Sequence, residues 1–146
     1  MPPTSPAVEA VLHASAVSVE GRGLLITGGS GSGKSTLALR LMALGATLVA
    51  DDKVILAVTP DGAVRMSCPG ATRGLIEARG VGLIRAEASD ATAVAVVDMD
   101  RTEDARLPAP RHIAIQGRDL PLIRRVESPA FADILLLYLR GGVAET

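Results

Sequence analysis

Apolar residues in this chain occur mostly in short runs of strand length, separated by polar turns. The turns at 59–62 (Thr-Pro-Asp-Gly) and 116–119 (Gln-Gly-Arg-Asp) each separate two such runs and predict β-hairpins. A third turn at 20–23 predicts another hairpin. Together these patterns predict strands over residues 11–19, 24–27, 46–50, 54–58, 63–66, 92–97, 111–115 and 120–126.

Two stretches have the spacing of a helix. Residues 35–44 predict one helix, and Gly45 ends it as a C-cap. Ser128 and Pro129 predict a second helix, with Pro129 at its first position and Gly141 after its end. The glycine-punctuated segment 74–85 predicts a functional loop around a short helical turn. We therefore expect an α/β protein with a mixed, strand-rich sheet, rather than a regular alternation of strands and helices.

The length of 146 residues favours one domain, and we expect a loose tail over residues 1–8 and a single domain over 9–146. Apolar residues make up 48% of the chain with only one Phe and one Tyr, so the core should be aliphatic. The net charge of −1 argues against a nucleic-acid-binding surface. A single cysteine, no signal-peptide pattern and no apolar run long enough for a bilayer predict a cytoplasmic protein without membrane association.

Residues 28–35 fit the phosphate-binding loop pattern G-x-x-x-x-G-K-[ST] at every fixed position. A strand-like run precedes them and a helix-like run follows, which is the order that such a loop requires. In this kind of loop, backbone N–H groups and the helix N-terminus hold phosphate, Lys34 reaches the β- and γ-phosphates, and the Ser35 hydroxyl can bind Mg²⁺. The expected nucleotide-binding residues are Gly28, Gly29, Ser30, Gly31, Ser32, Gly33, Lys34, Ser35 and Thr36.

Two apolar runs end in carboxylates that could serve phosphoryl transfer. Asp51 and Asp52 follow one run, and Asp98 follows another, with Asp100 nearby. Paired carboxylates raise one another's pKa, which suits one member of the first pair to proton transfer. The residues alone also allow a solvated turn at the first pair and a plain strand end at Asp98.

Three further residues have roles that the residues alone leave open. Glu77 is either a surface charge or a functional acid, and His13, flanked by apolar residues, is either structural or functional. Cys68 has no metal-ligand neighbours and predicts only packing. A metal site of the Cys/His type is therefore not expected.

The chain resembles the catalytic domain of HPr kinase/phosphorylase, a bacterial serine kinase that modifies the phosphocarrier protein HPr. His13 lies 21 positions before Lys34, at the family's distance. Residues 48–52, Leu-Val-Ala-Asp-Asp, resemble the family's L-[IV]-A-D-D, and residues 75–84, Leu-Ile-Glu-Ala-Arg-Gly-Val-Gly-Leu-Ile, resemble its L-I-E-[IV]-R-G-L-G-I-I. The resemblance covers about residues 11–85 and has no counterpart of the regulatory N-terminal domain, as in the short form with the catalytic domain alone.

The resemblance implies an ATP-dependent serine kinase of the P-loop type that uses Mg²⁺, acts on an HPr-type phosphocarrier protein and forms a homo-oligomer, a hexamer. It implies that Asp52 accepts the proton of the substrate serine, and that Asp51 supports the metal or its partner acid. His13 is implied to lie near the transferred phosphate. Arg106, in Arg-Leu-Pro, is the candidate for an arginine of the family. The implied metal ligands are Ser35, Glu77 and Asp51.

One segment departs from the family. Its P-V-R-P-G-R-N segment, important for removing phosphate from HPr, corresponds here to residues 120–126, Leu-Pro-Leu-Ile-Arg-Arg-Val. We therefore expect the kinase reaction, while the altered segment puts phosphorolysis of the seryl-phosphate product in question. Two alternatives remain: a P-loop small-molecule kinase or NTPase that uses Asp98, and an inactive nucleotide-sensing module. The chain contains no Asn, so the guanine-reading N-K-x-D motif is absent, which argues against a GTPase.

Overall fold

The computed structural model describes residues 9–142 and 144. The expected tail over residues 1–8 lies outside this range. The described part contains two α-helices, one short 3₁₀ helix and eleven strands. They are β1 (Glu9–Leu12), β2 (Ser15–Val19), β3 (Arg22–Thr27), α1 (Lys34–Ala43), β4 (Thr47–Ala50), β5 (Val54–Val58), β6 (Val64–Ser67), η1 (Gly70–Thr72), β7 (Leu75–Ala78), β8 (Gly82–Arg85), β9 (Ala91–Thr102), β10 (His112–Ile115), β11 (Arg118–Arg125) and α2 (Phe131–Gly141).

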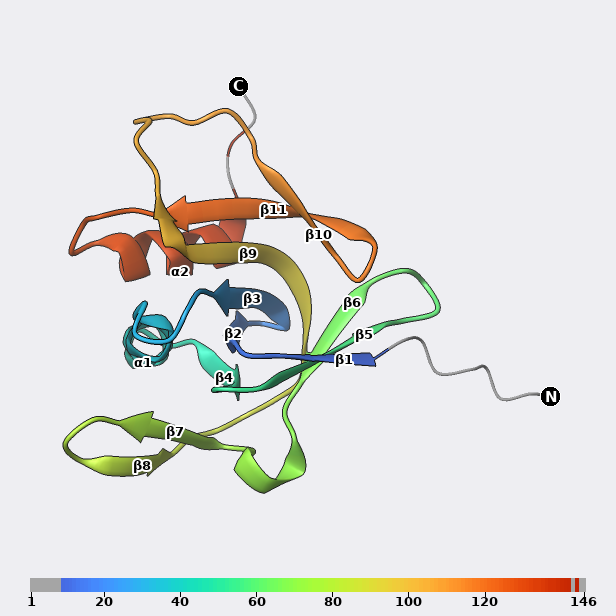
Figure 1. The fold of residues 1–146 in the computed structure, drawn as a ribbon, viewed down its shortest axis with the longest axis vertical. Helices are drawn as coiled ribbons and strands as arrows, with labels where there is room; N and C mark the ends of the chain where they lie inside the picture. Colours follow the sequence, from blue (N-terminus) through green and yellow to red (C-terminus); the bar gives the residue numbers. More distant parts are fainter. Residues whose placement is uncertain (1–8, 143, 145–146) are drawn as a thin grey trace.

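Nine of these strands form one mixed sheet (Figure 1). Its main path runs β1-β5-β6-β9-β3-β2-β4, and β11 pairs with β9 and with β10. The strands β3 and β11 are parallel to β9, whereas the other pairs of this sheet are antiparallel. The expected mixed, strand-rich α/β architecture is therefore confirmed.

The expected hairpins form at all three turns. Two of them are two-residue turns in which both residues have positive φ, at Glu20-Gly21 (52° and 78°) and Gln116-Gly117 (50° and 76°). Such turns match the right-handed twist of the flanking strands, and a glycine in the second position adopts positive φ without a steric penalty. The first of these hairpins leads β3 directly into the loop at 28–33.

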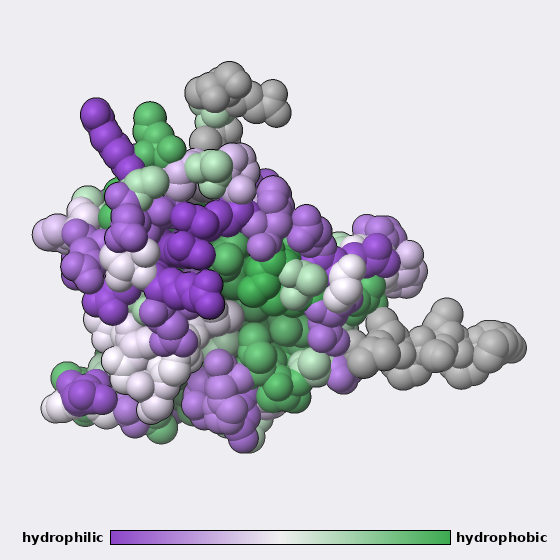
Figure 2. Space-filling model, turned by 45° about the horizontal axis from the view of Figure 1, so that its top comes forward, coloured by the Kyte–Doolittle hydropathy of each residue, from purple (hydrophilic) through white to green (hydrophobic). Residues whose placement is uncertain are grey.

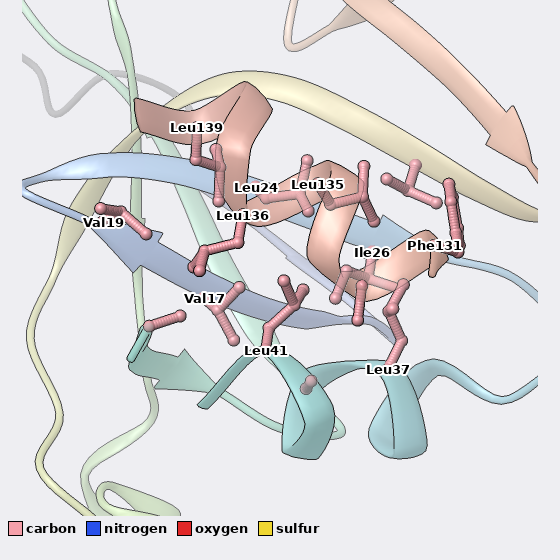
Figure 3. Close-up of a cluster of buried hydrophobic side chains, with 14 of the residues drawn as sticks. Val17, Val19, Leu24, Ile26, Leu37, Leu41, Phe131, Leu135, Leu136 and Leu139 are labelled. Carbon is pink, nitrogen blue, oxygen red and sulfur yellow. The ribbon is translucent and has the colours of Figure 1, made fainter. Parts of the chain in front are cut away.

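Both helices cover one face of the sheet, where the larger part of the core lies (Figure 3). Side chains of a strand alternate between its two faces. Leu24 and Ile26 of β3 therefore pack with Leu41 and Leu135 of the helices, whereas Leu25 packs in a second cluster on the opposite face. The core is aliphatic as expected, with Phe131 as its one phenylalanine.

The end of α1 lies one residue earlier than the sequence predicts, since the helix ends at Ala43, Leu44 is its C-cap and Gly45 follows. Gly45, at φ 114°, donates its backbone N–H to the Met42 carbonyl, and Ala46 donates to the Leu41 carbonyl. This pair of hydrogen bonds satisfies carbonyls that the last turn of the helix leaves free.

The expected start of α2 is wrong by two residues. Ser128 and Pro129 stand in a turn before the helix, which begins at Phe131 with Ala130 as N-cap. The Ser128 hydroxyl accepts the N–H of Ala130 within this turn instead of capping the helix. Gly141 is the last helical residue rather than the residue after the end.

The single strand expected over residues 11–19 is two strands. The chain bends at 13–14, so that β1 pairs with β5 while β2 pairs with β3 and β4. The apolar pattern continues through the bend because Ala14 is fully buried, which hides the break from sequence reasoning. The bend places His13 outside both strands.

The loop expected over residues 74–85 is also wrong, because β7 and β8 form an antiparallel hairpin there, apart from the main sheet (Figure 1). Ile76 of β7 is buried in the cluster that contains the helices, which anchors the hairpin against α1. The helical turn expected within 74–85 does not form there; the short 3₁₀ helix η1 lies before this segment. The strand expected over 92–97 continues to Thr102, so Asp98 lies within β9 rather than at its end.

None of the helices in the described part of the chain is long and apolar enough to cross a membrane.

Candidate active site

The glycine-rich segment 28–33 links the end of β3 to the start of α1. Gly33, at φ 96°, is the N-cap of α1, and no side chain in the described residues caps this end of the helix. A Cβ at Gly28 would lie 2.5 Å from the Ser32 hydroxyl oxygen, so a larger residue would force the loop open. The first backbone N–H groups of α1 therefore have no side-chain cap, and an uncapped helix N-terminus is a geometry suited to an anion.

Lys34, the first residue of α1, folds its side chain back over this loop. Its ammonium group donates hydrogen bonds to the carbonyl oxygens of Gly28 (2.8 Å) and Gly29 (2.9 Å). The charge thus lies over the loop, without a carboxylate partner in the described residues. It is free to meet an incoming anion.

Asp51 lies at the end of β4 and is buried, with 8% of the residue exposed. One of its carboxylate oxygens accepts hydrogen bonds from two hydroxyls, Ser35 of α1 at 2.8 Å and Ser15 of β2 at 2.7 Å. These two contacts connect the start of α1 to the sheet. Sequence reasoning did not single out Ser15, which is one of two buried serines in β2, the other being Ser18.

Asp52 lies beside His13, whereas Asp51 has the two serine hydroxyls as its partners. The Asp52 backbone has φ 72°, a conformation that Asp tolerates better than most residues, and its side chain is exposed. The carboxylate lies 3.6 Å from Nδ1 of His13, and the Ala14 N–H donates to the Asp52 carbonyl at 3.3 Å. The bend between β1 and β2 is therefore held against the turn after β4, which brings together two residues that are 39 positions apart in the sequence.

A second acidic pair adjoins the loop from β9. Asp98 stands beside Thr27 in the parallel pairing of β3 and β9, and its carboxylate accepts the N–H of Asp100 at 2.8 Å. The Asp100 carboxylate accepts the N–H of Gly29 through both oxygens, at 3.0 and 3.1 Å. Sequence reasoning noted Asp100 only as a neighbour of Asp98. The signal was the spacing of two acids on one strand face.

Glu77 and Arg106 are not joined to these residues by any hydrogen bond or ion pair within residues 9–142 and 144. Glu77 is exposed on β7. Arg106 is exposed in the segment between β9 and β10, which projects at the top of Figure 1. Their expected roles stay predictions.

Two pockets adjoin the loop, one at each end. The first has a volume of about 540 Å³ and borders Ser32, Gly33 and Thr36; we call it the helix-side pocket because α1 and α2 supply much of its wall. The second, the strand-side pocket, has a volume of about 520 Å³ and borders Gly28 and Gly29. Its other lining residues are Leu12, His13, Thr27, Asp98, Asp100, Ile113 and Ile115.

The face that contains β9 to β11 is chemically divided. Figure 2 shows an area of hydrophobic surface directly beside strongly hydrophilic residues. The strand-side pocket has the same mixture, since partly buried Leu12, Ile113 and Ile115 face a histidine and two aspartates. It therefore offers both apolar contact and groups that can exchange protons.

Residues 5–94 match the family model described as HPr Serine kinase C-terminal domain. The chain belongs to this family. The match includes the glycine-rich loop, both aspartates of 51–52, His13 and the β7–β8 hairpin.

Curated relatives in this family are named HPr kinase/phosphorylase. The protein from Bordetella pertussis is 48% identical over 73 residues, which is 50% of this chain and 24% of the relative. The protein from Clostridium novyi is 47% identical over 78 residues, 53% of this chain and 25% of the relative. The matched part thus spans about a quarter of these relatives' length.

The fold similarity extends further along the chain. A solved structure entitled HPr(Ser) kinase/phosphatase from Coxiella burnetii superposes with a TM-score of 0.75 at 26% identity. The superposition covers 90% of this chain and 88% of the other. The strands and helix after residue 94 therefore keep the family's architecture where the sequence match has ended.

Membership of a kinase family implies a nucleotide, and the residues around the loop fit one that carries Mg²⁺. Ser35 donates its hydroxyl proton to Asp51, which leaves the lone pairs of the Ser35 oxygen available to a cation. No three His, Cys, Asp or Glu side chains within residues 9–142 and 144 come close enough to hold a metal alone. Protein sites for Mg²⁺ commonly use one or two carboxylates together with substrate phosphates, so this donor set is sufficient.

The segment that carries Arg106 is closed at its base by an ion pair. Arg111 donates to both carboxylate oxygens of Glu103, at 3.0 and 3.2 Å, and the Glu103 side chain is only 8% exposed. The hydrogen bonds from Arg111 and from the N–H of Ala105 lower the pKa of Glu103 to about 2. This bidentate ion pair holds the two ends of the segment close together.

We expect Glu103→Gln to lower the stability of the protein at neutral pH. The folded-state pKa of Glu103 lies below its ordinary value of 4.5, so the carboxylate stabilises the fold above about pH 4.5, and this contribution is lost as the pH falls toward about 2. Urea unfolding at a series of pH values should show a difference from wild type that shrinks below about pH 4.5. Glu87→Gln, at an exposed position, is the matched control. A loss of unfolding free energy in Glu103→Gln that stayed constant with pH would contradict a stabilising role of the ionised Glu103 carboxylate.

Proposed function

We propose that this chain transfers the γ-phosphoryl group of ATP to a serine hydroxyl of an HPr-type phosphocarrier protein. The observation that carries the proposal is the placement of an exposed His13–Asp52 pair near the end of a loop with the features of an anion cradle. Membership of the HPr Serine kinase C-terminal domain family supports the same reaction. The matched part spans only a quarter of the length of these relatives, so the match does not by itself carry over their acceptor. The identity of the acceptor protein is therefore part of the proposal.

The nucleotide's phosphates would bind along residues 28–36. Backbone N–H groups of the loop and the start of α1 would hold the phosphate oxygens, and Lys34 would exchange its two carbonyl partners for the β- and γ-phosphates. Exchanging neutral acceptors for a charged one strengthens each hydrogen bond. The loop and Lys34 thereby spread the charge that develops on the transferred group.

The acceptor side would be formed by Asp52 and His13. Asp52 accepts the proton of the serine hydroxyl as its oxygen bonds to the γ-phosphorus, while the bond from that phosphorus to the bridging oxygen breaks and ADP leaves with the electron pair. His13, 3.6 Å from the same carboxylate, orients it and lies near the transferred phosphate. Both side chains are exposed, so a folded protein substrate can reach them.

Ser35 and Asp51 would hold Mg²⁺, with Glu77 of β7 as the third ligand that the resemblance implies. Bound there, the ion neutralises phosphate charge. Asp51 already keeps the Ser35 hydroxyl in one orientation, and Ser15 holds Asp51. The arginine role of Arg106 and the hexamer that the resemblance implies remain parts of the proposal.

A transfer assay tests the proposal directly. The chain, Mg²⁺ and ATP labelled at the γ-phosphate are incubated with an HPr-type protein and, separately, with a variant of that protein that lacks the acceptor serine. We expect label on the intact partner and none on the variant. ATP binding without label on either partner would instead favour a small-molecule kinase or a nucleotide-sensing module.

The same labelled product tests the reverse reaction. Residues 120–126 lie largely in β11, where Arg124 pairs with β9 beside Asp98, rather than in a Pro-Gly turn. We therefore expect inorganic phosphate to release little label from the partner. Rapid release would show that phosphorolysis does not need the family's P-V-R-P-G-R-N segment.

A further inference from the structure

The strand-side pocket contains more groups than proton transfer to Asp52 requires. Its apolar side comes from three partly buried residues, Leu12 at the end of β1 and Ile113 and Ile115 on one face of β10. In the sheet, β5, β6, β9 and β11 lie between β1 and β10. Figure 1 shows the strong curvature of β9 that lets these two distant strands border one pocket. The pocket is therefore a product of the whole sheet.

The acidic side of the pocket comes from β9. Asp98 and Asp100 both line it, two positions apart and thus on one face of the strand. Backbone N–H groups orient both carboxylates, because Asp98 accepts from Asp100 and Asp100 accepts from Gly29. Among the ion pairs of residues 9–142 and 144, none involves either carboxylate. The two negative charges therefore face the pocket without a cationic partner in the described part of the chain.

Two cationic residues lie near this pocket, and neither forms an ion pair with its carboxylates. Arg124 of β11 is the register partner of Asp98, yet no ion pair joins them. The Lys34 ammonium group lies on the carbonyl oxygens of Gly28 and Gly29, which line the pocket, and would move to the phosphates of a bound nucleotide. The nucleotide would also add negative charge at the loop. The pocket thus suits a positive group best in the state that is ready for transfer.

We propose that the strand-side pocket binds a lysine or arginine side chain of the acceptor protein, one that lies next to the acceptor serine. The aliphatic stem of that side chain packs on the three apolar residues, and its charged end reaches the two carboxylates. His13 borders the pocket and lies 3.6 Å from the Asp52 carboxylate, which places the bound side chain beside the proposed proton acceptor. This inference rests on the proposed function, because it assumes that the serine reaches Asp52.

The same features disfavour other occupants. An anion would face two carboxylates. A wholly apolar side chain would remove water from both carboxylates and offer them no partner, which costs free energy. A long basic side chain satisfies both halves of the pocket, and the volume of about 520 Å³ has room for it.

Substitutions on the acceptor test the charge. Each lysine and arginine on the surface around the serine of an HPr-type protein is replaced in turn by methionine, which keeps an unbranched stem and removes the charge. With the wild-type chain, we expect one replacement to raise the KM for the acceptor about tenfold, with little change in kcat or in the KM for ATP. If none of the replacements raised the KM for the acceptor, the proposal would be overturned.

Charge reversal tests whether the sensitive residue meets this pocket. Asp98→Lys should raise the KM for the unmodified acceptor at least tenfold, and an acceptor with glutamate at the sensitive position should recover most of that loss. A merely structural role of Asp98 cannot produce such a rescue. Asp119→Lys, at an exposed position on β11 outside the pocket, is the matched control and should change neither value. Losses that simply add would mean that the basic side chain binds elsewhere.

Two adjacent residues of β1 test the apolar half without altering the acids. Leu12 lines the pocket, whereas Val11 lies on the other face of the strand and is 61% exposed. Leu12→Lys places an ammonium group of this chain in the pocket, so the KM for the acceptor should rise about tenfold while the Kd for ATP stays the same. Val11→Lys should behave as the wild type. Equal values for the two variants would contradict the assignment.

The wild-type assay separates this inference from the proposed function. If the wild type does not phosphorylate the acceptor serine, the proposed function fails and the pocket assignment fails with it. If the serine is phosphorylated but the charge substitutions leave the KM for the acceptor unchanged, the function stands and the assignment is wrong. An effect of Leu12→Lys without any effect of the acceptor's basic residues would show that the pocket takes an apolar side chain, which also overturns the proposal.

Discussion

Asp52→Asn should abolish most phosphoryl transfer while ATP still binds. The substitution keeps the size and hydrogen-bonding shape of the side chain and removes its ability to accept the serine proton. General-base catalysis is worth about 10²- to 10⁴-fold, so kcat should fall by that factor. Asp52 is exposed and makes no hydrogen bond through its carboxylate to the phosphate loop, so the Kd for ATP should change little. Transfer rates and equilibrium ATP binding on the same preparation measure both effects.

Two comparisons make the Asp52→Asn result specific. Asp119→Asn changes an exposed aspartate on β11 in the same way, and should leave transfer and ATP binding at wild-type values. Asp98→Asn tests the acid that a small-molecule kinase of this fold would use. Full transfer in Asp52→Asn together with loss in Asp98→Asn would move the proton acceptor from the turn after β4 to β9.

Lys34→Ala should weaken both nucleotide binding and transfer. Its ammonium group is the charge nearest the loop carbonyls, and we propose that it moves to the β- and γ-phosphates when the nucleotide binds. Loss of one preorganised charged donor typically lowers kcat by about 10²- to 10³-fold, and the Kd for ATP should rise as well. Isothermal titration with ATP and the labelled-transfer assay measure the two effects separately.

Lys53→Ala is the matched control, because Lys53 is the only other lysine of the chain and is exposed. It should bind ATP as the wild type does. Since Lys34 contacts only backbone carbonyls of its own loop, Lys34→Ala should also unfold at nearly the wild-type temperature. Wild-type ATP affinity in Lys34→Ala would mean that the phosphates bind elsewhere.

Local turn chemistry explains why much of the fold could be predicted from the sequence. The loop before α1, the glycine that ends this helix and the three hairpin turns each depend on a few adjacent residues with particular backbone angles. The strands beside those turns then follow from short apolar runs.

Three of the wrong expectations depend at least partly on contacts between distant residues, whereas the wrong start of α2 depends on a local turn at Ser128. The break at 13–14 arises because β1 and β2 pair with different partners, while apolar residues continue through it. The β7–β8 hairpin is stabilised by the pairing of its two strands and by burial of Ile76 in the cluster that contains the helices. The glycines and charged residues of this segment gave the sequence the pattern of a loop. Asp98 and Asp100 lie within β9 because the strand continues alongside β11.

The residues of the candidate site also fall into two groups, those in contiguous motifs and those that depend on long-range contacts. Residues 28–36 and the pair Asp51–Asp52 were recognisable as contiguous motifs. Their long-range partners were not: Ser15 on Asp51 and Asp100 on Gly29 join elements that only the sheet topology brings together. The pockets at the two ends of the loop likewise combine residues from distant strands and helices, so no sequence pattern marks them.

The most direct test of the central claim identifies the phosphorylated residue. The chain is incubated with Mg²⁺, ATP and an HPr-type protein, and the partner is then digested and analysed by mass spectrometry. The account predicts one phosphoserine on the partner, formed by the wild type and nearly absent with Asp52→Asn. ATP consumed with no phosphoserine on the partner would contradict it.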